Sequence, residues 1–75
     1  MTYNWVVYNK ENMEKVGELT TNHSIDLQYA LYLLDVRLIR VDNPDDPDIE
    51  IRGKKYWSQD LDVLLKEEYD EVANA

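Results

Sequence analysis

The absence of cysteine constrains this chain most, because the chain is also short. It has 75 residues, and neither a disulfide nor a thiolate metal site can reinforce its core. A chain of this length buries only about 60% of the surface that its unfolded form exposes and cannot divide that surface between two cores. We therefore expect a single compact domain over residues 1–75, stabilised by packing or by association with another chain.

The composition predicts a folded protein rather than a disordered acidic one. Apolar residues make up 44% of the chain, which is too much for a segment that cannot form a core. The first residues lack the basic and apolar regions of a secretory signal, and no apolar run approaches the ~20 residues that span a bilayer. We expect a soluble, cytoplasmic protein, and its negative charge argues against binding to anionic membranes.

The first half of the chain predicts a hairpin followed by a helix. Residues 3–8 are aromatic and β-branched and precede a polar turn at 9–12, so residues 13–20 are expected to form the second strand. Ser24 precedes an apolar-rich run and predicts a helix that it caps and that ends at about Asp35.

The second half predicts extended segments and a final helix. Residues 36–41 favour a strand, and two prolines make residues 43–48 an acidic loop. Residues 49–57 predict a hairpin with Gly53 and Lys54 at its tip, in a register that places Ile51 opposite Tyr56.

Ser58 is expected to cap the last helix, and residues 70–75 to fray because acids crowd its far end. The apolar face of this predicted helix comprises Leu61, Leu64, Leu65 and Val72. The resulting order, β-β-α-β-β-β-α, predicts an α+β fold in which one antiparallel sheet of four to five strands carries both helices on one face.

Charge is distributed unevenly along the chain. Residues 42–75 contain 11 acidic and 4 basic residues, and so carry −7 of the formal net charge of −8, whereas residues 1–41 are close to neutral. A segregated acidic surface attracts basic partners and repels nucleic acid. The alternative is that the acids only keep a small domain soluble, although such charge is better interspersed with the opposite sign.

The candidate binding residues are the acids of the loop, the strand after it and the last helix. They are Asp42, Asp45, Asp46, Asp48, Glu50, Glu67, Glu68, Asp70 and Glu71. Carboxylates on one face lie ~6.7 Å apart along a strand and ~5–6 Å apart on a helix, which resembles the charge spacing of a nucleic-acid backbone. If the last helix packs beside the loop, they form one continuous negative ridge.

The sequence contains no catalytic, metal or cofactor motif. His23 is the only histidine, so it has no partners for a zinc site or a nucleophilic triad. Counted from Asp42, a calcium loop would need glycine and glutamate where Pro47 and Gly53 stand. Residues 52–57 are basic and aromatic, but the net charge opposes phosphate binding. We expect no enzyme activity, no cofactor, no metal and no direct binding of nucleic acid.

The leading hypothesis is a non-enzymatic domain that binds a basic protein surface, as an inhibitor that takes the place of nucleic acid. The partner would then be a nucleic-acid-binding protein. In size, acidity and the order of helix and hairpin the chain resembles the small proteins of bacteriophages and other mobile elements. That resemblance is one of composition over the whole chain, and inhibitors of host defence occur among such proteins.

The alternative is a homo-oligomeric structural or assembly module, such as a homodimer. The apolar arc of the first predicted helix is wider than one small sheet requires. The residues expected at this oligomer face are Ile25, Tyr29, Tyr32 and Leu33.

Overall fold

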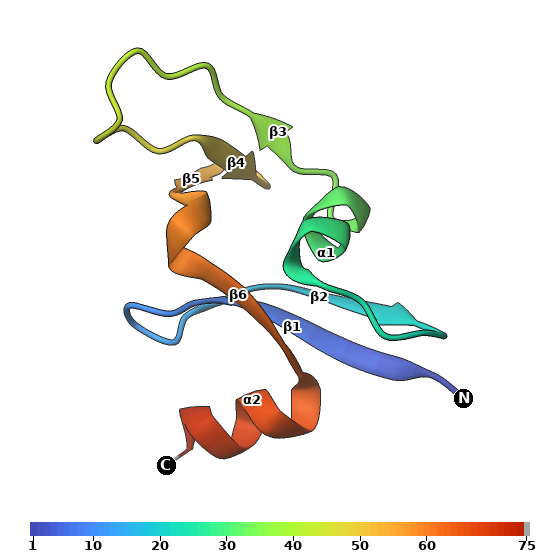
Figure 1. Cartoon of the computed structure of the whole chain (residues 1–75). Coiled ribbons are helices and arrows are strands. Elements are labelled where there is room, and N and C mark those ends of the chain that lie inside the picture. The colour runs from blue at the N-terminus through green and yellow to red at the C-terminus, as the bar shows by residue number, and fades with distance from the viewer. Residues whose placement is uncertain (75) are drawn as a thin grey trace.

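Two small antiparallel sheets and two helices make up the fold (Figure 1). The computed structural model describes residues 1–74. Its elements are β1 (Tyr3–Asn9), β2 (Lys15–Thr21), α1 (Leu27–Leu33), β3 (Arg37–Leu38), β4 (Ile49–Ile51), β5 (Lys54–Tyr56), the 3₁₀ turn η1 (Ser58–Asp60), β6 (Leu61–Leu65) and α2 (Lys66–Ala73). The predicted α+β class with two helices is confirmed. The expected single sheet of four to five strands is instead six strands in two sheets, ordered β2-β1-β6 and β3-β4-β5.

β1 is the central strand of the first sheet and is buried on both faces. It pairs with β2 on one side and β6 on the other, so that Trp5 lies opposite both Leu19 and Leu65. Val6 and Val7 point to opposite faces, and at most 1% of either residue is exposed. A continuous aromatic and β-branched run suits a strand in this position.

The two helices cover opposite faces of this first sheet. Val7 belongs to the main core, which also contains Ala30 of α1 and Ile49 of the second sheet. On the other face, Tyr8 meets Tyr69 of α2 with 5.6 Å between ring centroids. The prediction of both helices on one face is therefore wrong, because β1 has apolar residues at consecutive positions and needs a cover on each side (Figure 1).

α1 begins later than predicted. Its N-cap is Asp26, whose Oδ1 accepts a hydrogen bond of 2.9 Å from the backbone N–H of Tyr29. That N–H belongs to the third helical residue, the usual target of a capping side chain, and Ser24 stands two positions too early to reach it. The helix ends at Leu33, and Asp35 takes the left-handed conformation (φ 57°) that often follows a helix.

Gly17 lets α1 approach the first sheet closely. A Cβ atom at this position would lie 3.0 Å from Cδ1 of Leu34, which is the C-cap residue of α1. The register of β1 and β2 also shifts between Val7 and Tyr8, as it does at a β-bulge. The lack of a side chain at Gly17 thus leaves room for Leu34 to pack against the sheet.

The β4–β5 hairpin forms with a register different from the predicted one. Its two-residue turn is Arg52-Gly53, with φ angles of 53° and 82°, and Ile49 rather than Ile51 lies opposite Tyr56. A turn in which both residues have positive φ matches the twist of the flanking strands. The two registers differ by two residues in their pairing, so Ile49, Ile51 and Tyr56 share one face of the hairpin in either.

Residues 61–65, predicted to be helical, form strand β6. Ser58 opens the 3₁₀ turn η1 instead of the last helix, and the O atom of Asp60 accepts a hydrogen bond of 2.7 Å from the N–H of Lys10. Residues 61–65 form a strand because the backbone N–H and C=O groups on the second edge of β1 need hydrogen-bond partners. α2 then starts at Lys66. Residues 70–73 of the segment expected to fray are helical, and residue 75 lies outside the described residues.

None of the helices within residues 1–74 is long and apolar enough to cross a membrane.

Candidate acidic interface

The structure separates the candidate acids into two groups. The loop between β3 and β4 lies at one end of the molecule and α2 at the other (Figure 1), and the longest extent of the molecule is 42 Å. α2 packs on the outer face of the first sheet, whereas the loop projects from the second sheet. The continuous ridge expected from the sequence is therefore not formed.

The loop group consists of Asp42, Asp45 and Asp46, all exposed. The loop is fixed in part by Trp57, whose Nε1 donates a hydrogen bond of 3.0 Å to the O atom of Asp45. A shallow pocket of ≈ 410 Å³ is lined by Asp42 and Asp46 but also by Arg40 and Lys55. These two basic residues thus partly balance the negative charge of the loop.

Asp48 is held by a residue of η1. Its two carboxylate oxygens accept hydrogen bonds from the N–H and the Oγ of Ser58, at 2.8 and 2.6 Å. These bonds favour the charged form and lower the pKa of Asp48 below its usual range. Asp48 joins the loop to η1, and its oxygens are less available to a partner than those of its neighbours.

Glu50 is also engaged within the molecule. Its Oε1 lies 3.8 Å from Nη1 of Arg37, and Lys55 is its cross-strand neighbour in the hairpin. Two acids of the predicted site, Asp48 and Glu50, are therefore engaged in contacts within the molecule, around the second sheet.

The four acids of α2 remain as an unpaired group, here called the α2 acids. Glu67, Glu68, Asp70 and Glu71 are all exposed. Residues 1–74 contain three ion pairs, and none of them includes an α2 acid. Lys66 is the only basic residue in the helix.

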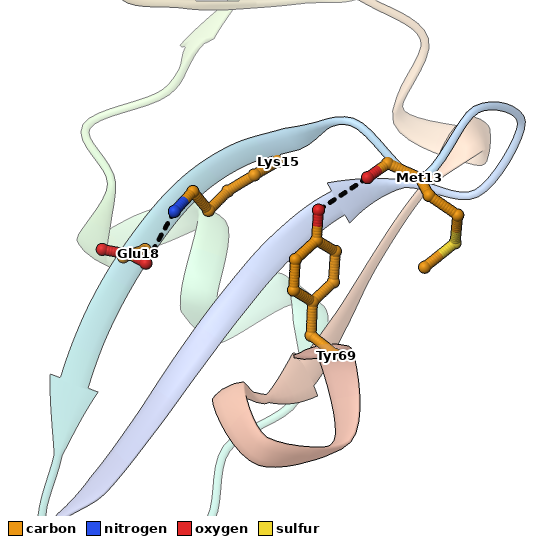
Figure 2. Close-up of polar contacts among 4 residues, drawn as sticks. All are labelled: Met13, Lys15, Glu18 and Tyr69. Carbon is orange, nitrogen blue, oxygen red and sulfur yellow. Dashed lines mark hydrogen bonds and ion pairs between the residues drawn. The ribbon is translucent and has the colours of Figure 1, made fainter. Parts of the chain in front are cut away.

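Tyr69 fixes the orientation of α2. Its hydroxyl donates a hydrogen bond of 2.6 Å to the O atom of Met13 in the β1–β2 turn, and its ring packs on Tyr8 (Figure 2). With Tyr69 turned toward the sheet, the acids on either side of it face solvent. The acceptor of Tyr69 lies 56 residues away in the chain and has no local signal in the sequence.

A second polar contact lies on the same face of the first sheet (Figure 2). Nζ of Lys15 is 3.0 Å from Oε1 of Glu18. This hydrogen bond and the attraction between the charges raise the pKa of Lys15 and lower that of Glu18. Lys15 is thus paired with Glu18, and the charge of Asp70 in α2 acts on it more weakly.

The outer edge of β6 is closed by a side chain. Oδ1 of Asp62 accepts a hydrogen bond of 2.8 Å from the N–H of Val63. Since Asp60 bonds to β1, alternation along the strand directs the N–H of Val63 away from β1, toward the free edge. A carboxylate at this position hinders another strand from pairing there.

The predicted oligomer face is partly buried. Ile25 packs against the main core, whereas Tyr29, Tyr32 and Leu33 are 43%, 80% and 44% exposed. Leu38 of β3 is 87% exposed, and sequence reasoning assigned it to a strand without placing it at this face.

The described residues show no constellation typical of catalysis. Within residues 1–74 no group of three or more histidine, aspartate or glutamate side chains could hold a metal ion. A groove of ≈ 420 Å³ between the start of β1 and α2 is open and lined mainly by polar residues, including Asn4, Lys66 and Asp70. The fold and the site thus describe a small α+β domain with an acidic helix.

No family model, curated protein or solved structure matches the chain. The functional argument therefore depends on the residues of this chain.

Proposed function

We propose that this protein is a non-enzymatic binding domain whose α2 acids engage a basic surface of another protein. The observation that carries the proposal is that Glu67, Glu68, Asp70 and Glu71 are exposed and take part in none of the ion pairs found in residues 1–74. Charges that are left unpaired and close together attract an oppositely charged surface over a long range.

The position of the acids within the helix supports the same conclusion. Glu67 and Glu68 lie in the first turn, where the helix dipole favours negative charge, but Asp70 and Glu71 lie near the negative end, and the last turn contains no basic residue. Lysine or arginine side chains of a partner would relieve this repulsion. Binding is thus expected to stabilise α2.

The loop acids are a weaker candidate. Arg40 and Lys55 line the same pocket as Asp42 and Asp46, so an approaching basic surface meets both signs of charge. The α2 acids have only Lys66 on their helix.

The partner class that fits is a nucleic-acid-binding protein. Helix carboxylates ~5–6 Å apart can occupy positions that phosphates otherwise fill. The protein would then act as an inhibitor, in competition with nucleic acid. Because α2 has eight residues and is about 12 Å long, it would cover a few basic residues rather than a long groove.

Two variants with equal loss of charge test the proposal. One replaces Glu67, Glu68 and Glu71 by glutamine, and the other replaces Asp42, Asp45 and Asp46 by asparagine. Proteins bound to the immobilised wild-type chain are eluted by a salt gradient, and the affinity of the most salt-sensitive one is measured by calorimetry at low and high salt. We expect the helix variant to bind at least about tenfold more weakly and the loop variant to bind nearly as well as wild type.

Competition by DNA and RNA tests the inhibitor role. Either nucleic acid should displace the protein from its partner, and the affinity should fall steeply with salt. If the helix variant keeps its affinity while its circular dichroism spectrum is unchanged, the proposal is wrong.

A further inference from the structure

We propose that α1 and β3 form the interface of a two-fold symmetric homodimer, in which β3 of one copy pairs with β3 of a second. This inference does not depend on the α2 acids, which lie at the other end of the molecule (Figure 1). The surface in question, here called the α1–β3 patch, consists of Tyr29, Tyr32, Leu33 and Leu38.

The α1–β3 patch is apolar and exposed. Tyr29, Tyr32 and Leu33 are spaced three and four residues apart and so share one side of α1. Tyr32 is 80% exposed and the other two more than 40%. The rings of Tyr29 and Tyr32 lie 6.4 Å apart, which makes the surface partly aromatic, as protein interfaces often are.

Leu38 extends this surface along the second sheet. It lies opposite Ile49, so its side chain is on the core face of that sheet, the face on which α1 packs through Ala30. Leu38 is nevertheless 87% exposed, because the core ends before the sheet does. A large apolar side chain on the inner face of a sheet is left without a cover.

The backbone of β3 offers a pairing edge at the same point. β3 is the outer strand in the order β3-β4-β5. The N–H of Ile39 donates a hydrogen bond of 2.8 Å to the O atom of Asp48 on the β4 side. Alternation along the strand then turns the N–H and C=O groups of Leu38 outward. Two copies related by a two-fold axis through Leu38 would exchange both of these hydrogen bonds.

The charges around the α1–β3 patch select a second copy as the occupant. Residues 26–40 contain two acids and two arginines and so have no formal net charge, whereas the whole chain carries −8. A second acidic copy is therefore repelled least when it approaches here. A two-fold axis through Leu38 brings the same patch of both copies together, as such interfaces require.

A typical stable interface buries about 800 Å² per partner, which is roughly one seventh of the 5511 Å² that this chain exposes. β6 does not offer the same opportunity, since Asp62 occupies the N–H of Val63 at its edge. The outward positions of β2 include Glu18 and Thr20, which are polar.

Sedimentation equilibrium over a micromolar concentration range tests the dimer with the full chain. We expect twice the mass of one chain for wild type, at low and at high salt. Tyr32→Ser and Leu38→Ser should each raise the dimer dissociation constant by at least about tenfold. Val72→Ser removes an exposed apolar residue from α2 and should leave the constant unchanged.

Cross-linking locates the two-fold axis. The chain has no cysteine, so Leu38→Cys introduces a single thiol, and the ~5.5 Å expected between paired Cα atoms is within the range of a disulfide. An added oxidant should convert this variant rapidly to a covalent dimer, and Val72→Cys only slowly. A monomeric wild type, or equal cross-linking of the two variants, would overturn the proposal. Neither result would affect the binding role of α2.

Discussion

The carboxylate of Asp48 shows how one residue of an acidic segment can have a structural role. Both of its oxygens accept hydrogen bonds from Ser58, and this contact connects the loop to the turn that precedes β6. Asp46, two residues earlier, is exposed, and no hydrogen bond of its side chain is found in residues 1–74. Acids of the same loop are therefore not equivalent.

The contact between Asp48 and Ser58 predicts that the stability difference between wild type and Asp48→Asn depends on pH. Asp48→Asn should lower the free energy of unfolding by about 1–2 kcal/mol near neutral pH, because a charged acceptor of two hydrogen bonds is lost. The pKa of Asp48 is lowered in the folded state, so its contribution is complete above the pKa of the unfolded chain and is lost as pH falls through the folded value.

Urea unfolding at neutral and at strongly acidic pH measures this effect. The gap between wild type and Asp48→Asn should close at acidic pH. Asp46→Asn should change stability by less than about 0.5 kcal/mol at either pH. A gap that stays constant down to acidic pH would mean that the charge of Asp48 is not what stabilises the fold.

At the scale of the element, α2 is attached to the fold without a buried residue of its own. No side chain caps its N-terminus. A helix of this length is not stable alone in water. Its attachment relies on Tyr69, through the ring of Tyr8 and the carbonyl of Met13.

Tyr69→Phe should therefore loosen α2 selectively. The ring contact is kept and one hydrogen bond is removed, at a cost of about 1 kcal/mol, or roughly fivefold in the opening equilibrium. Hydrogen exchange of the α2 amides should accelerate by about this factor, while the β1 amides change less. Tyr56→Phe, in β5, is the control and should have no effect on the α2 amides. Equal acceleration in α2 and β1 would indicate that α2 does not open on its own.

Some elements could be predicted from their residues and others could not, for identifiable reasons. β1 could be predicted because a run of aromatic and β-branched residues favours an extended strand. Residues 61–65 satisfy two patterns, since Leu61, Leu64 and Leu65 have helical spacing while Leu61, Val63 and Leu65 alternate, and only the pairing with β1 decides. The turn at Gly53 likewise fits two registers that place Ile49 and Ile51 on the same face, so their burial does not decide between them, and the turn forms where Arg52 and Gly53 both have positive φ.

The candidate site was predictable in composition but not in arrangement. The acidic residues can be identified from the sequence, but whether they lie close together in space depends on which face of the first sheet α2 covers. That choice is made by Tyr69, through contacts with Tyr8 and Met13 that are distant in the sequence. The engagement of Asp48 by Ser58 is equally a tertiary contact.

For the whole molecule, a net charge of −8 lowers the stability of so small a folded domain. The three ion pairs of residues 1–74 join largely exposed partners and contribute little each. Repulsion among the remaining acids opposes the folded state.

Sodium chloride should therefore stabilise the protein. We expect the free energy of unfolding to rise by up to about 1 kcal/mol between low and moderate salt, because the repulsion is screened more than the weak ion pairs. The variant with glutamine at positions 67, 68 and 71 should show a smaller rise. Thermal unfolding at fixed protein concentration measures both. A wild type that loses stability with salt would indicate that its ion pairs outweigh the repulsion.

The pairing of β1 with β6 has a consequence for how the protein is made. Trp5 lies opposite Leu65, so β1 leaves the ribosome well before the strand that completes its sheet. Until then Val6 and Val7 have no complete cover, and a contact between such distant parts of a chain forms slowly. β6 must therefore emerge from the exit tunnel before the first sheet can close.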